Sequence, residues 1–417
     1  MKNANEWVEK SLFDLAQYIN GYAFKPEDWG KDGLPIIRIE QLKKPDGPAD
    51  YYSGKIATAY VVEDGDLLFS WSASLFLSIW KHGQAVLNQH IFKVLEHEGV
   101  DRLFLKYFIE FHLPELIKAS HGSTMQHITR KELERFKAIF PISLTEQTKI
   151  AEILLTVDRA IEQTELMIAK QRRIKTGLMQ DLLKRGIDKH GNVRSIQENQ
   201  FKDSPLGRIP EEWGVMKFED ITPINSPIGY GIVQPGSYDY TGVKVAGIYT
   251  INSDFQRWHM SSNKIEQAYT RSRIRPGDVL LSVKGTIGRV GVVPEGINGN
   301  ISREIARIRP VESINPYFLR LLMLSDFFQK YLGDAEVGTT RAEISIKILR
   351  NLYVVVPPLP EQNEIAFRIS QFELHIENLQ RELAKLQSLK KGLMQGLVTG
   401  KFRVNSLLRS ESEVMSQ

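Results

Sequence analysis

Residues 146–182 read EQTKIAEILLTVDRAIEQTELMIAKQRRIKTGLMQDL, and residues 361–397 read EQNEIAFRISQFELHIENLQRELAKLQSLKKGLMQGL. The two stretches align over their whole length, 215 positions apart, without an insertion or deletion. Both begin with Glu-Gln, and both carry Gly-Leu-Met-Gln near their end, from Gly177 and from Gly392. A chain that repeats a long segment in register contains two versions of one structural unit.

Apolar residues in both stretches recur in alternating steps of four and three. This spacing persists over about five heptads, which is typical of a coiled coil rather than of a surface helix with a wider apolar stripe. It predicts that the two helices pair with each other. Two separate amphipathic helices, each covering its own domain, are the alternative, but they do not explain the shared register. The predicted seam residues are Ile150, Leu154, Val157, Ile161, Ile168, Leu178, Ile365, Ile369, Phe372, Ile376, Leu379, Leu383, Leu386 and Leu393.

The direction of pairing follows from the order of the parts. Each long helix comes after its own globular region, so a parallel pair would place both regions at one end. An antiparallel pair places them at opposite ends about a pseudo-twofold axis, and this is the arrangement we expect. Each helix rises about 55 Å at 1.5 Å per residue, which is comparable to about 16 base pairs at 3.4 Å each.

The composition is that of a soluble globular protein with two or three domains. The chain has 417 residues, of which 42% are apolar and 25% are charged. No apolar run approaches the roughly 18 residues that cross a bilayer, and the first residues, from Met1 to Lys10, are unlike a signal peptide. We therefore expect a cytoplasmic protein with no membrane partner.

Several classes of site are excluded or disfavoured. The chain has no cysteine, which excludes disulfides, thiolate zinc sites and a cysteine nucleophile. The nine histidines lack the short paired spacing of a metal site, so we expect no metal in this chain. The net charge of +4 and a pI near 8.9 favour a polyanionic partner without proving one.

The repeat continues outside the long helices with small changes in separation. Each globular region is predicted to mix α and β structure, because short β-branched or aromatic runs alternate with Gly, Pro, Asn and Asp turns. One apolar helix is expected in each region, at Leu103–Ala119 and at Tyr317–Leu332. The matching segments are Trp7 and Trp213, Gly65–Ser70 and Gly277–Ser282, Phe104–Lys106 and Phe318–Arg320, and Gly122–Thr124 and Gly338–Thr340.

These features predict an α+β protein in which two mixed α/β domains are joined by two long antiparallel coiled-coil helices. The helices keep their length while the domains have drifted, which indicates one scaffold of fixed length that carries two domains free to differ. The predicted parts are a first domain at 1–144, a long helix at 145–185, a linker at 186–212, a second domain at 213–358, a second long helix at 359–402 and a flexible tail at 403–417.

Signatures of catalysis are missing from the sequence. There is no phosphate loop of the Gly-x4-Gly-Lys-Ser/Thr type, and Gly285, Gly288 and Gly291 are followed by Pro294 instead of opening a helix as a dinucleotide site requires. An Asn/Asp-Pro-Pro-aromatic segment, as in amino-methyltransferases, is also absent. We expect that this chain performs no chemistry by itself and holds no cofactor.

Basic and hydrogen-bonding side chains gather at the predicted turns and suit the readout of DNA. Arg can bond guanine and Gln can bond adenine in bidentate fashion, while hydroxyls reach bases or phosphates. A single Ser, Thr or Lys on a turn is more often simply solvated, and a Trp there is more often part of a core. The candidate DNA-binding residues are Trp71, Ser72, Ser74, Lys81, Gln89, His90, Ser123, Thr124, Gln126, Lys284, Thr286, Arg289, Arg303, Thr339, Thr340 and Arg341.

In these features the chain resembles the specificity subunits of type I restriction-modification systems, over nearly its whole length. The resemblance rests on two Glu-Gln-x-x-Ile-Ala helices that carry Gly-Leu-Met-Gln. It also rests on the linker string from Ser204 to Trp213, on Pro-Leu-Pro-Glu-Gln at 358–362 and on Leu-x-Thr-Gly-Lys at 397–401. The sequence departs from the pattern at Ile142–Thr145, which replaces the Pro-Leu-Pro approach in the first repeat.

The resemblance implies a DNA-reading subunit with two target recognition domains, each contacting one half of a bipartite, asymmetric site on double-stranded DNA. It further implies two modification (methyltransferase) subunits that carry S-adenosylmethionine and methylate adenine. Restriction subunits with ATP-driven translocation would join that core. S-adenosylmethionine, ATP and Mg are thus expected on partner subunits, and none of them in this chain.

A coiled-coil adaptor whose two domains bind proteins is the alternative that the seam alone leaves open. A self-sufficient nuclease or methyltransferase is disfavoured by the missing motifs. DNA binding measured across a salt series separates the DNA-reading subunit from the adaptor. Phosphate contacts impose a steep salt dependence, and a protein adaptor would show none.

Overall fold

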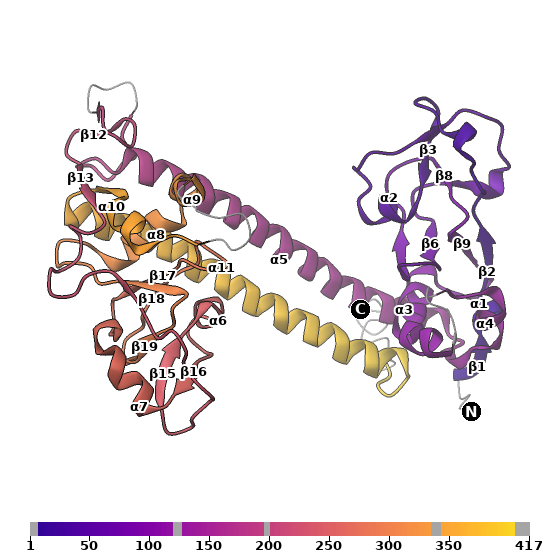
Figure 1. The fold of residues 1–417 in the computed structure, drawn as a ribbon. Helices are drawn as coiled ribbons and strands as arrows, with labels where there is room; N and C mark the ends of the chain where they lie inside the picture. The colour runs from indigo at the N-terminus through magenta and orange to yellow at the C-terminus, as the bar shows by residue number, and fades with distance from the viewer. Residues whose placement is uncertain (1–6, 120–126, 196–200, 335–342, 405–417) are drawn as a thin grey trace, which may run out of the picture. The chain divides into compact units, whose positions relative to one another are not determined.

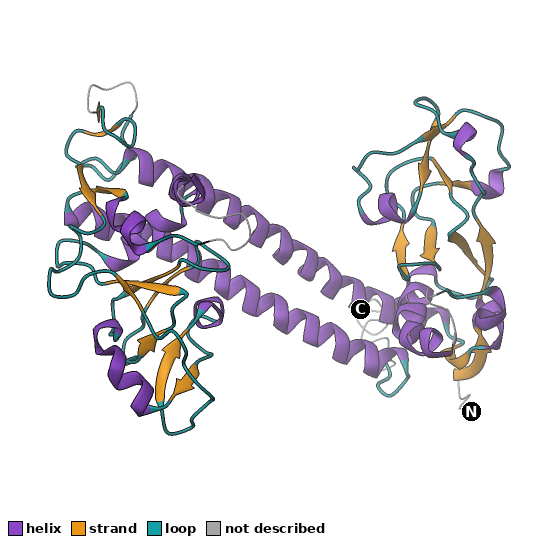
Figure 2. Ribbon diagram, in the orientation of Figure 1, coloured by secondary structure: helices purple, strands orange, loops and turns teal. Residues whose placement is uncertain are grey.

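The computed structural model describes residues 7–119, 127–195, 201–334 and 343–404. The chain divides into two compact units, Met1–Leu166 with Arg381–Gln417 and Met167–Gln380. Each unit combines one α/β domain with parts of both long helices, and Figures 1 and 2 locate the elements. The overall class is α+β, as the sequence predicts.

The first unit is built on a pairing of its first and last strands. β1 (Trp7–Ser11) runs antiparallel to β10 (Lys137–Pro141), which closes the domain at the point where the long helix begins. The helix α3 (Arg102–Ala119) packs its apolar residues into the main core of this unit. One four-stranded sheet has the order β2-β9-β6-β7 and another has the order β4-β3-β8-β5. Their strands are β2 (Ala16–Asn20), β9 (Ile91–Glu96), β6 (Leu67–Ser70), β7 (Phe76–Ile79), β4 (Tyr51–Tyr52), β3 (Leu34–Ile37), β8 (Ala85–Leu87) and β5 (Val61–Val62).

The second unit repeats this plan. β13 (Gly214–Lys217) pairs antiparallel with β21 (Tyr353–Val356), and two sheets follow in the orders β14-β20-β17-β18 and β16-β15-β19. The strands are β14 (Gly229–Tyr230), β20 (Ile305–Ile308), β17 (Val279–Ser282), β18 (Val290–Val292), β16 (His259–Ser261), β15 (Val243–Ala246) and β19 (Asn300–Ile301). The shorter helices of both units are α1 (Leu12–Leu15), α2 (Ile39–Lys43), α4 (Arg130–Arg135), α6 (Ile248–Asn252), α7 (Asn263–Glu266), α8 (Pro316–Leu324), α9 (Asp326–Asp334) and α10 (Ile346–Asn351).

The single helix predicted at Tyr317–Leu332 is wrong, because the structure divides it into α8 and α9. Ser325 lies between them with extended backbone angles, φ −66° and ψ 147°. Its hydroxyl donates to the carbonyl of Leu322 and accepts from the amide of Phe328, so it serves the end of one helix and the start of the next. A serine that bonds nearby backbone groups competes with helix continuation, and the apolar spacing does not reveal this.

The long helices are α5 (Leu144–Arg185) and α11 (Leu359–Leu393), and α11 continues into the π-helical turn η4 (Met394–Val398). The first seam residues of each helix belong to the core of a globular domain. Ile150 and Leu154 lie in the main core of the first unit, and Ile365 and Ile369 lie in the main core of the second. Near the other end of each helix, Leu178 packs against the core of the second unit and Leu393 packs against the core of the first. The apolar spacing therefore includes domain-core residues at both ends of each long helix.

Two lysines interrupt the apolar frame at matching positions, Lys175 in α5 and Lys390 in α11. In the second unit, Lys175 Nζ lies 3.0 Å from Glu373 Oε1 of α11. In the first unit, Lys390 Nζ lies 2.6 Å from Asp158 Oδ1 of α5. Asp158 and Glu373 are themselves 215 positions apart, so the two ion pairs are copies of each other. A charge at each break is thus paired with a carboxylate of the other long helix.

A buried glutamate at the start of each long helix joins three parts of its unit. In the first unit, Glu146 accepts a hydrogen bond from the Trp7 indole at 3.2 Å. It also forms an ion pair with Arg403, whose Nε lies 2.7 Å from Glu146 Oε1. Trp7 opens the domain, and Arg403 follows the other long helix. The carboxylate therefore connects the start of α5 to strand β1 and to the segment after η4.

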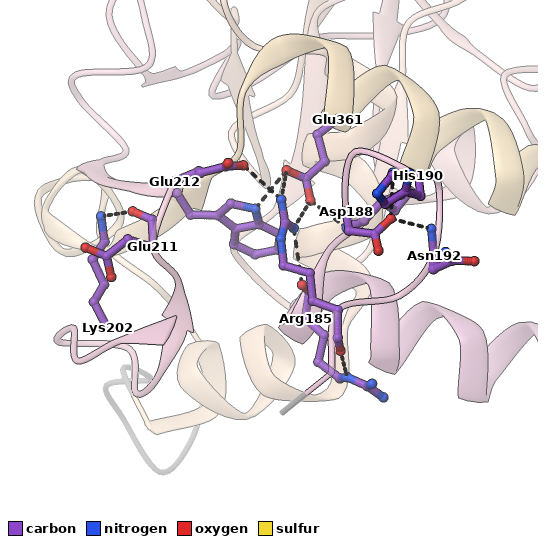
Figure 3. Close-up of polar contacts among 11 residues, drawn as sticks. Arg185, Asp188, His190, Asn192, Lys202, Glu211, Glu212 and Glu361 are labelled. Atoms are coloured by element: carbon purple, nitrogen blue, oxygen red, sulfur yellow. Dashed lines mark hydrogen bonds and ion pairs between the residues drawn. The ribbon is translucent and has the colours of Figure 1, made fainter. Parts of the chain in front are cut away.

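The second unit has the same arrangement around Glu361. The Trp213 indole donates to Glu361 Oε2 at 3.1 Å, and Arg194 Nη1 lies 2.5 Å from Oε1. Arg194, which follows α5, also pairs with Glu212. The amide of Ile187 donates to Glu361 Oε1, and Figure 3 shows Glu361 and Glu212 in this arrangement. Burial acts to lower the pKa of Arg194, but the hydrogen bonds and charges of Glu361 and Glu212 together outweigh burial and raise this pKa. Part of the predicted linker 186–212 is thus folded against the start of α11.

The glutamine that follows each glutamate fixes the helix start to its own domain. Gln147 donates to the carbonyls of Gly99 and Pro141 and accepts from the amide of Asp101. In the second unit, Gln362 donates to two carbonyls and accepts from one amide in the same way. Both side chains are fully buried with all three bonds made, so the Glu-Gln pair of the repeat has a structural explanation.

Glycine is required where each tryptophan meets the end of the other long helix. Gly186 has φ +65° and Gly400 has φ +70°. A Cβ on Gly186 would lie 2.6 Å from the Trp213 ring, and a Cβ on Gly400 would lie 3.1 Å from the Trp7 ring. The left-handed turn and the close approach together exclude larger residues.

Replacing Glu361 with alanine is expected to destabilise the second unit by about 3 kcal/mol, because it leaves the buried Arg194 without its main carboxylate. Urea unfolding followed by circular dichroism measures the change. Glu364→Ala is the matched control on the same helix. Its exposed pair with Arg368 is worth less than about 0.5 kcal/mol. Equal losses for the two variants would contradict a special role of Glu361.

Acidification is expected to weaken the second unit through Glu373. Burial acts to raise the pKa of Glu373, but Arg320 and Lys175 outweigh it and hold the pKa below its ordinary 4.5. A lowered pKa stabilises the fold above pH 4.5 and loses this contribution as pH falls through the folded value. The stability difference between the wild type and Glu373→Gln should therefore shrink below about pH 4.5. A difference that stays constant from pH 7 to pH 3 in urea unfolding would refute this assignment.

Candidate nucleic-acid interface

Three chain segments meet at one end of the sheet β2-β9-β6-β7 in the first unit. They are the turn after β6, the residues before β9, and the chain from His127. The amide of Trp71 donates to the carbonyl of His90 at 3.3 Å, and the amide of Ile128 donates to the carbonyl of Trp71 at 3.0 Å. Ser72 also forms an isolated bridge with His127. We call Ser70–Ser74, Asn88–His90 and His127 face 1.

The second unit forms the same junction with the same backbone bonds. The amide of Val283 donates to the carbonyl of Glu304 at 2.9 Å, and the amide of Ile344 donates to the carbonyl of Val283 at 2.8 Å. The isolated bridge is here between Lys284 and Glu343. We call Ser282–Thr286, Ser302–Glu304 and Glu343 face 2. Two domains with different side chains therefore present one backbone framework.

The turn after the central strand has the same conformation in both faces. Ser70 donates its hydroxyl proton to the carbonyl of Ser74 at 2.5 Å, and Ser282 donates to the carbonyl of Thr286 at 2.6 Å. Ala73 has φ +60°, where Gly285 has φ +79°. A left-handed alanine costs roughly 1 kcal/mol or more and persists only where its surroundings hold it. Face 1 keeps this turn despite the cost, so the turn geometry itself matters.

Face 1 contains polar ring atoms that form no hydrogen bond with the described residues. The Trp71 ring lies 5.7 Å from the His90 ring and 5.8 Å from the His127 ring. Trp71 Nε1, His90 Nδ1 and His127 Nδ1 are buried and have no hydrogen-bond partner among the described residues. Burying such atoms without a partner is unfavourable. Three ring nitrogens with unused hydrogen-bonding capacity therefore lie together in face 1.

An aromatic group adjoins face 1 that the sequence analysis missed. The amide of Gln89 donates to the carbonyl of Tyr22, and the Tyr22 ring lies 4.9 Å from Phe24 and 5.8 Å from Tyr60. The Tyr22 side chain is exposed. Tyr60 comes from a segment far from Tyr22 and Phe24, so no spacing in the sequence indicates that the three rings meet. An exposed aromatic group of this kind suits contact with bases or their methyl groups.

Face 2 borders a hollow of about 770 Å³ in the second unit. His259 Nε2 and Ser302 Oγ are buried without a hydrogen-bond partner among the described residues, and both residues line this hollow. Lys284, Arg303 and Tyr249 also line it. The hollow thus combines unsatisfied polar atoms with basic side chains, which is a chemistry suited to base edges and phosphates. His259 was not predicted, because it enters from β16, far from the repeated turns.

One basic side chain of face 2 is partly neutralised. Lys284 Nζ lies 2.6 Å from Glu343 Oε2. The hydrogen bond from Lys284 lowers the pKa of the Glu343 carboxyl, which therefore stays ionised. Arg303 is exposed and has no carboxylate partner among the described residues. Arg303 is thus the more available cation of face 2.

The predicted DNA-binding residues separate into three groups. Lys81 does not join face 1, because it follows the far end of the β6–β7 hairpin, where Leu67 pairs with Ile79. Six predicted residues lie outside the described residues, namely Ser123, Thr124, Gln126, Thr339, Thr340 and Arg341. The structure gathers the others on face 1 or face 2 or beside them, namely Trp71, Ser72, Ser74, Gln89, His90, Lys284, Thr286, Arg289 and Arg303.

Two further searches cover the described part of the chain. Within residues 7–119, 127–195, 201–334 and 343–404, no group of three or more acidic or histidine side chains is placed to hold a metal ion. None of the helices in these ranges is long and apolar enough to span a membrane.

Comparison with known proteins identifies the family. The model of the family described as "Type I restriction modification DNA specificity domain" matches residues 4–170 and again residues 210–388. The chain belongs to this family of type I specificity proteins. The two matches coincide with the two copies of the repeat, and each contains one of the faces described above.

Curated relatives support the same assignment. The chain is 28% identical over 414 residues to the type I restriction enzyme EcoBI specificity subunit of Escherichia coli, covering 96% of this chain and 86% of that protein. It is 26% identical to the MjaVIII specificity subunit of Methanocaldococcus jannaschii, covering 96% of this chain and 94% of the relative.

Solved structures of type I specificity subunits have a similar fold. The S subunit from M. genitalium aligns with a TM-score of 0.59 and 15% identity, covering 95% of this chain and 98% of that one. A chain from a study of complex assembly and conformational transition in the type I system aligns with a TM-score of 0.54 and 17% identity, covering 96% of this chain. At this level of identity the likeness concerns the fold.

Proposed function

We propose that this protein is the DNA-reading subunit of a type I restriction-modification enzyme, in which each domain reads one half of a bipartite, asymmetric site. One observation carries the proposal. Face 1 and face 2 share their backbone hydrogen bonds but differ in almost every side chain. A framework that is repeated while its side chains vary suits two readers that approach DNA in the same way and recognise different bases.

The side chains of the two faces fit different base edges. On face 2, Arg303 can bond guanine O6 and N7 in bidentate fashion, and His259 and Ser302 offer further hydrogen bonds in the hollow. On face 1, Gln89 can bond adenine N6 and N7, and the neighbouring Tyr22 group can contact a thymine methyl. Such different chemistry predicts two unlike half-sites.

The long helices would set the distance between the half-sites. We infer that α5 and α11 form an antiparallel coiled coil, and the pairs Lys175–Glu373 and Lys390–Asp158 support this inference. In both pairs a residue late in one helix meets a residue earlier in the other. A stiff helical pair holds its two ends at one separation, so the spacer between half-sites would have a fixed length.

Catalysis would belong to partner subunits, because the sequence lacks methyltransferase, nuclease and nucleotide-binding motifs. Two modification subunits with S-adenosylmethionine, and restriction subunits with ATP and Mg, would assemble on this chain. Large apolar side chains exposed on the long helices offer surfaces for such partners. They are Leu166, Met167 and Ile174 on α5 and Phe367, Leu374 and Leu389 on α11.

Methylation mapping with single variants tests the two-reader proposal. Arg303→Ala, expressed with the modification partner, should relax one position of one half-site, since a bidentate contact contributes about 1–3 kcal/mol of discrimination. Gln89→Ala should relax a position in the other half-site. Lys81→Ala is the control and should leave the methylated sequence unchanged. Relaxation of the same half-site by both variants, or of neither, would refute the assignment of one half-site to each domain.

Lengthening both helices tests whether they set the spacer. Three heptads inserted after Leu166 in α5 and after Gln380 in α11 keep the apolar frame and add about 32 Å at 1.5 Å per residue. This is close to one DNA turn of about 34 Å, so each domain should meet the same side of the duplex. Methylation mapping should show a spacer longer by about 9–10 base pairs and unchanged half-sites.

A single heptad in each helix is the matched control for this experiment. It adds about 10 Å, or about three base pairs, which turns the second half-site to another side of the duplex. This shorter insertion should therefore impair methylation more than the long one. An unchanged spacer in the long variant would mean that the helices do not determine the separation.

A further inference from the structure

Five arginines gather on one side of the second unit, away from face 2. They come from two segments, Arg271, Arg273 and Arg275 before β17, and Arg307 and Arg309 in and after β20. Together they line a hollow of about 610 Å³, with Asn225, Ser226 and Thr270 among the neighbouring polar residues. Asn263 and Glu266 of α7, the helix labelled in Figure 1, line the same hollow. These arginines lie outside the repeated turns, so the repeat in the sequence does not point to them.

The position of the cluster is set by the strand pairing. β17 and β20 run antiparallel, so that Ser282 pairs with Ile305 and Val279 pairs with Ile308. Face 2 lies at the Ser282 end. Arg309 follows Ile308 and therefore lies beyond the opposite end. A four-residue strand is about 13 Å long, so face 2 and the exposed arginines of the cluster lie at opposite ends of these strands.

The segment 271–275 is held so that it presents its arginines outward. Arg271, Arg273 and Arg275 are exposed, while Ser272 and Ile274 between them are buried. Arg271 lies at the end of the 3-10 helix Gln267–Ser272, and Arg273 and Arg275 follow it directly, so three exposed arginines lie within five residues of one another.

Arg307 holds the backbone of that segment with hydrogen bonds from its buried side chain. It is 3% exposed and donates to the carbonyls of Arg271 and Arg273 at 3.0 and 3.1 Å. Its Nε is buried without a partner among the described residues. The backbone that carries Arg271 and Arg273 is thus held in place by hydrogen bonds from Arg307.

The cluster carries more positive charge than its acids neutralise. Glu266 forms two hydrogen bonds with Arg273, and Asp278 forms two with Arg309. No carboxylate pairs with Arg271, Arg275 or Arg307 among the described residues. Burial, followed by the charge of Arg309, lowers the pKa of Arg307, and the charge of Asp278 only partly opposes this.

The first unit shows that the fold does not require this cluster. Lys93 occupies the place of Arg307, since it pairs with Leu68 as Arg307 pairs with Leu280. Lys93 Nζ lies 2.7 Å from Asp66, the counterpart of Asp278, and is neutralised there. The corresponding segment before β6 contains no arginine. The surplus charge is therefore specific to the second domain.

We infer that Arg271 and Arg275, on a segment held in place by the buried Arg307, form a phosphate-binding surface that contacts the DNA backbone outside the half-site read by face 2. Guanidinium groups match phosphate oxygens in geometry and charge, and the surrounding Asn, Ser and Thr side chains add neutral hydrogen-bond donors. The inference rests on the proposed function, because it takes duplex DNA as the source of the phosphates. It adds an affinity site that reads no sequence and exists on one domain only.

The salt dependence of DNA binding by the full chain tests this surface. Arg271→Gln/Arg275→Gln removes two exposed charges and leaves Arg307 in place. Each lost phosphate contact lowers the slope of log K against log salt by about 0.9, so the slope should fall by about 1.8. The loss should be the same on duplexes with and without the recognition site. Lys189→Gln/Arg208→Gln removes the same net charge from the segment before the second domain and should leave the slope unchanged.

The outcomes separate this inference from the proposed function. If the wild type binds duplex DNA with a steep salt dependence and the arginine variant has the same slope, the surface does not contact DNA and only this inference fails. If the wild type does not bind DNA at all, the proposed function fails. Titration with inorganic phosphate at constant ionic strength covers the other source of phosphate. Saturable binding of free phosphate that the arginine variant loses would overturn the assignment to the DNA backbone.

Discussion

A buried carboxylate at the start of each long helix is the interaction on which the rest of the structure depends. Glu146 and Glu361 each receive the indole of the domain's first tryptophan and the guanidinium of an arginine that follows the other long helix. Because the partners are far apart in the chain, each contact closes a large loop. A buried ionised group needs all of these partners to offset its desolvation. The domain, its own helix and the end of the other helix are therefore held as one piece.

This junction explains why the helices vary less than the domains. The Glu-Gln pair, the tryptophan, the arginine and the glycine beside the tryptophan constrain one another through close contacts. Changing one of them leaves a buried polar group without a partner or places a Cβ in an occupied position. The loops of face 1 and face 2 are joined mainly by backbone hydrogen bonds, which do not depend on side-chain identity. Side chains there can change while the framework persists.

The two domains have diverged in electrostatics as well as in sequence. Face 1 offers aromatic rings and neutral hydrogen-bonding groups, whereas face 2 combines arginine, lysine and a hollow. The arginine cluster adds charge on the second domain alone. Under the proposed function, charge of this kind would contribute affinity without sequence readout, while the faces would supply the readout. The second domain would then bind DNA with the larger electrostatic contribution and the first domain with the smaller one.

The sequence by itself determined the repeat, the α+β class, the long helices and the turns that carry most of face 1 and face 2. Those features depend on local spacing, and local spacing is written directly in the chain. The lysines that break the apolar frame, Lys175 and Lys390, were visible as interruptions, but their carboxylate partners were not. The predicted helix that the structure divides at Ser325 was wrong because a single hydroxyl ended it, against an apolar pattern that continues.

Only the tertiary structure decided which distant side chains meet. Arg403 contacts Glu146 although the two residues are 257 positions apart in the sequence. His259 comes from another sheet to line the hollow beside face 2. Lys81 lies at the far end of the β6–β7 hairpin and is therefore not part of face 1. Arg307 meets the segment 271–275 only because β20 pairs with β17 in one register. Such contacts depend on strand register and on the packing of whole elements. A one-residue change in register would turn every side chain to the other face of the sheet, so no spacing within a segment could have specified them.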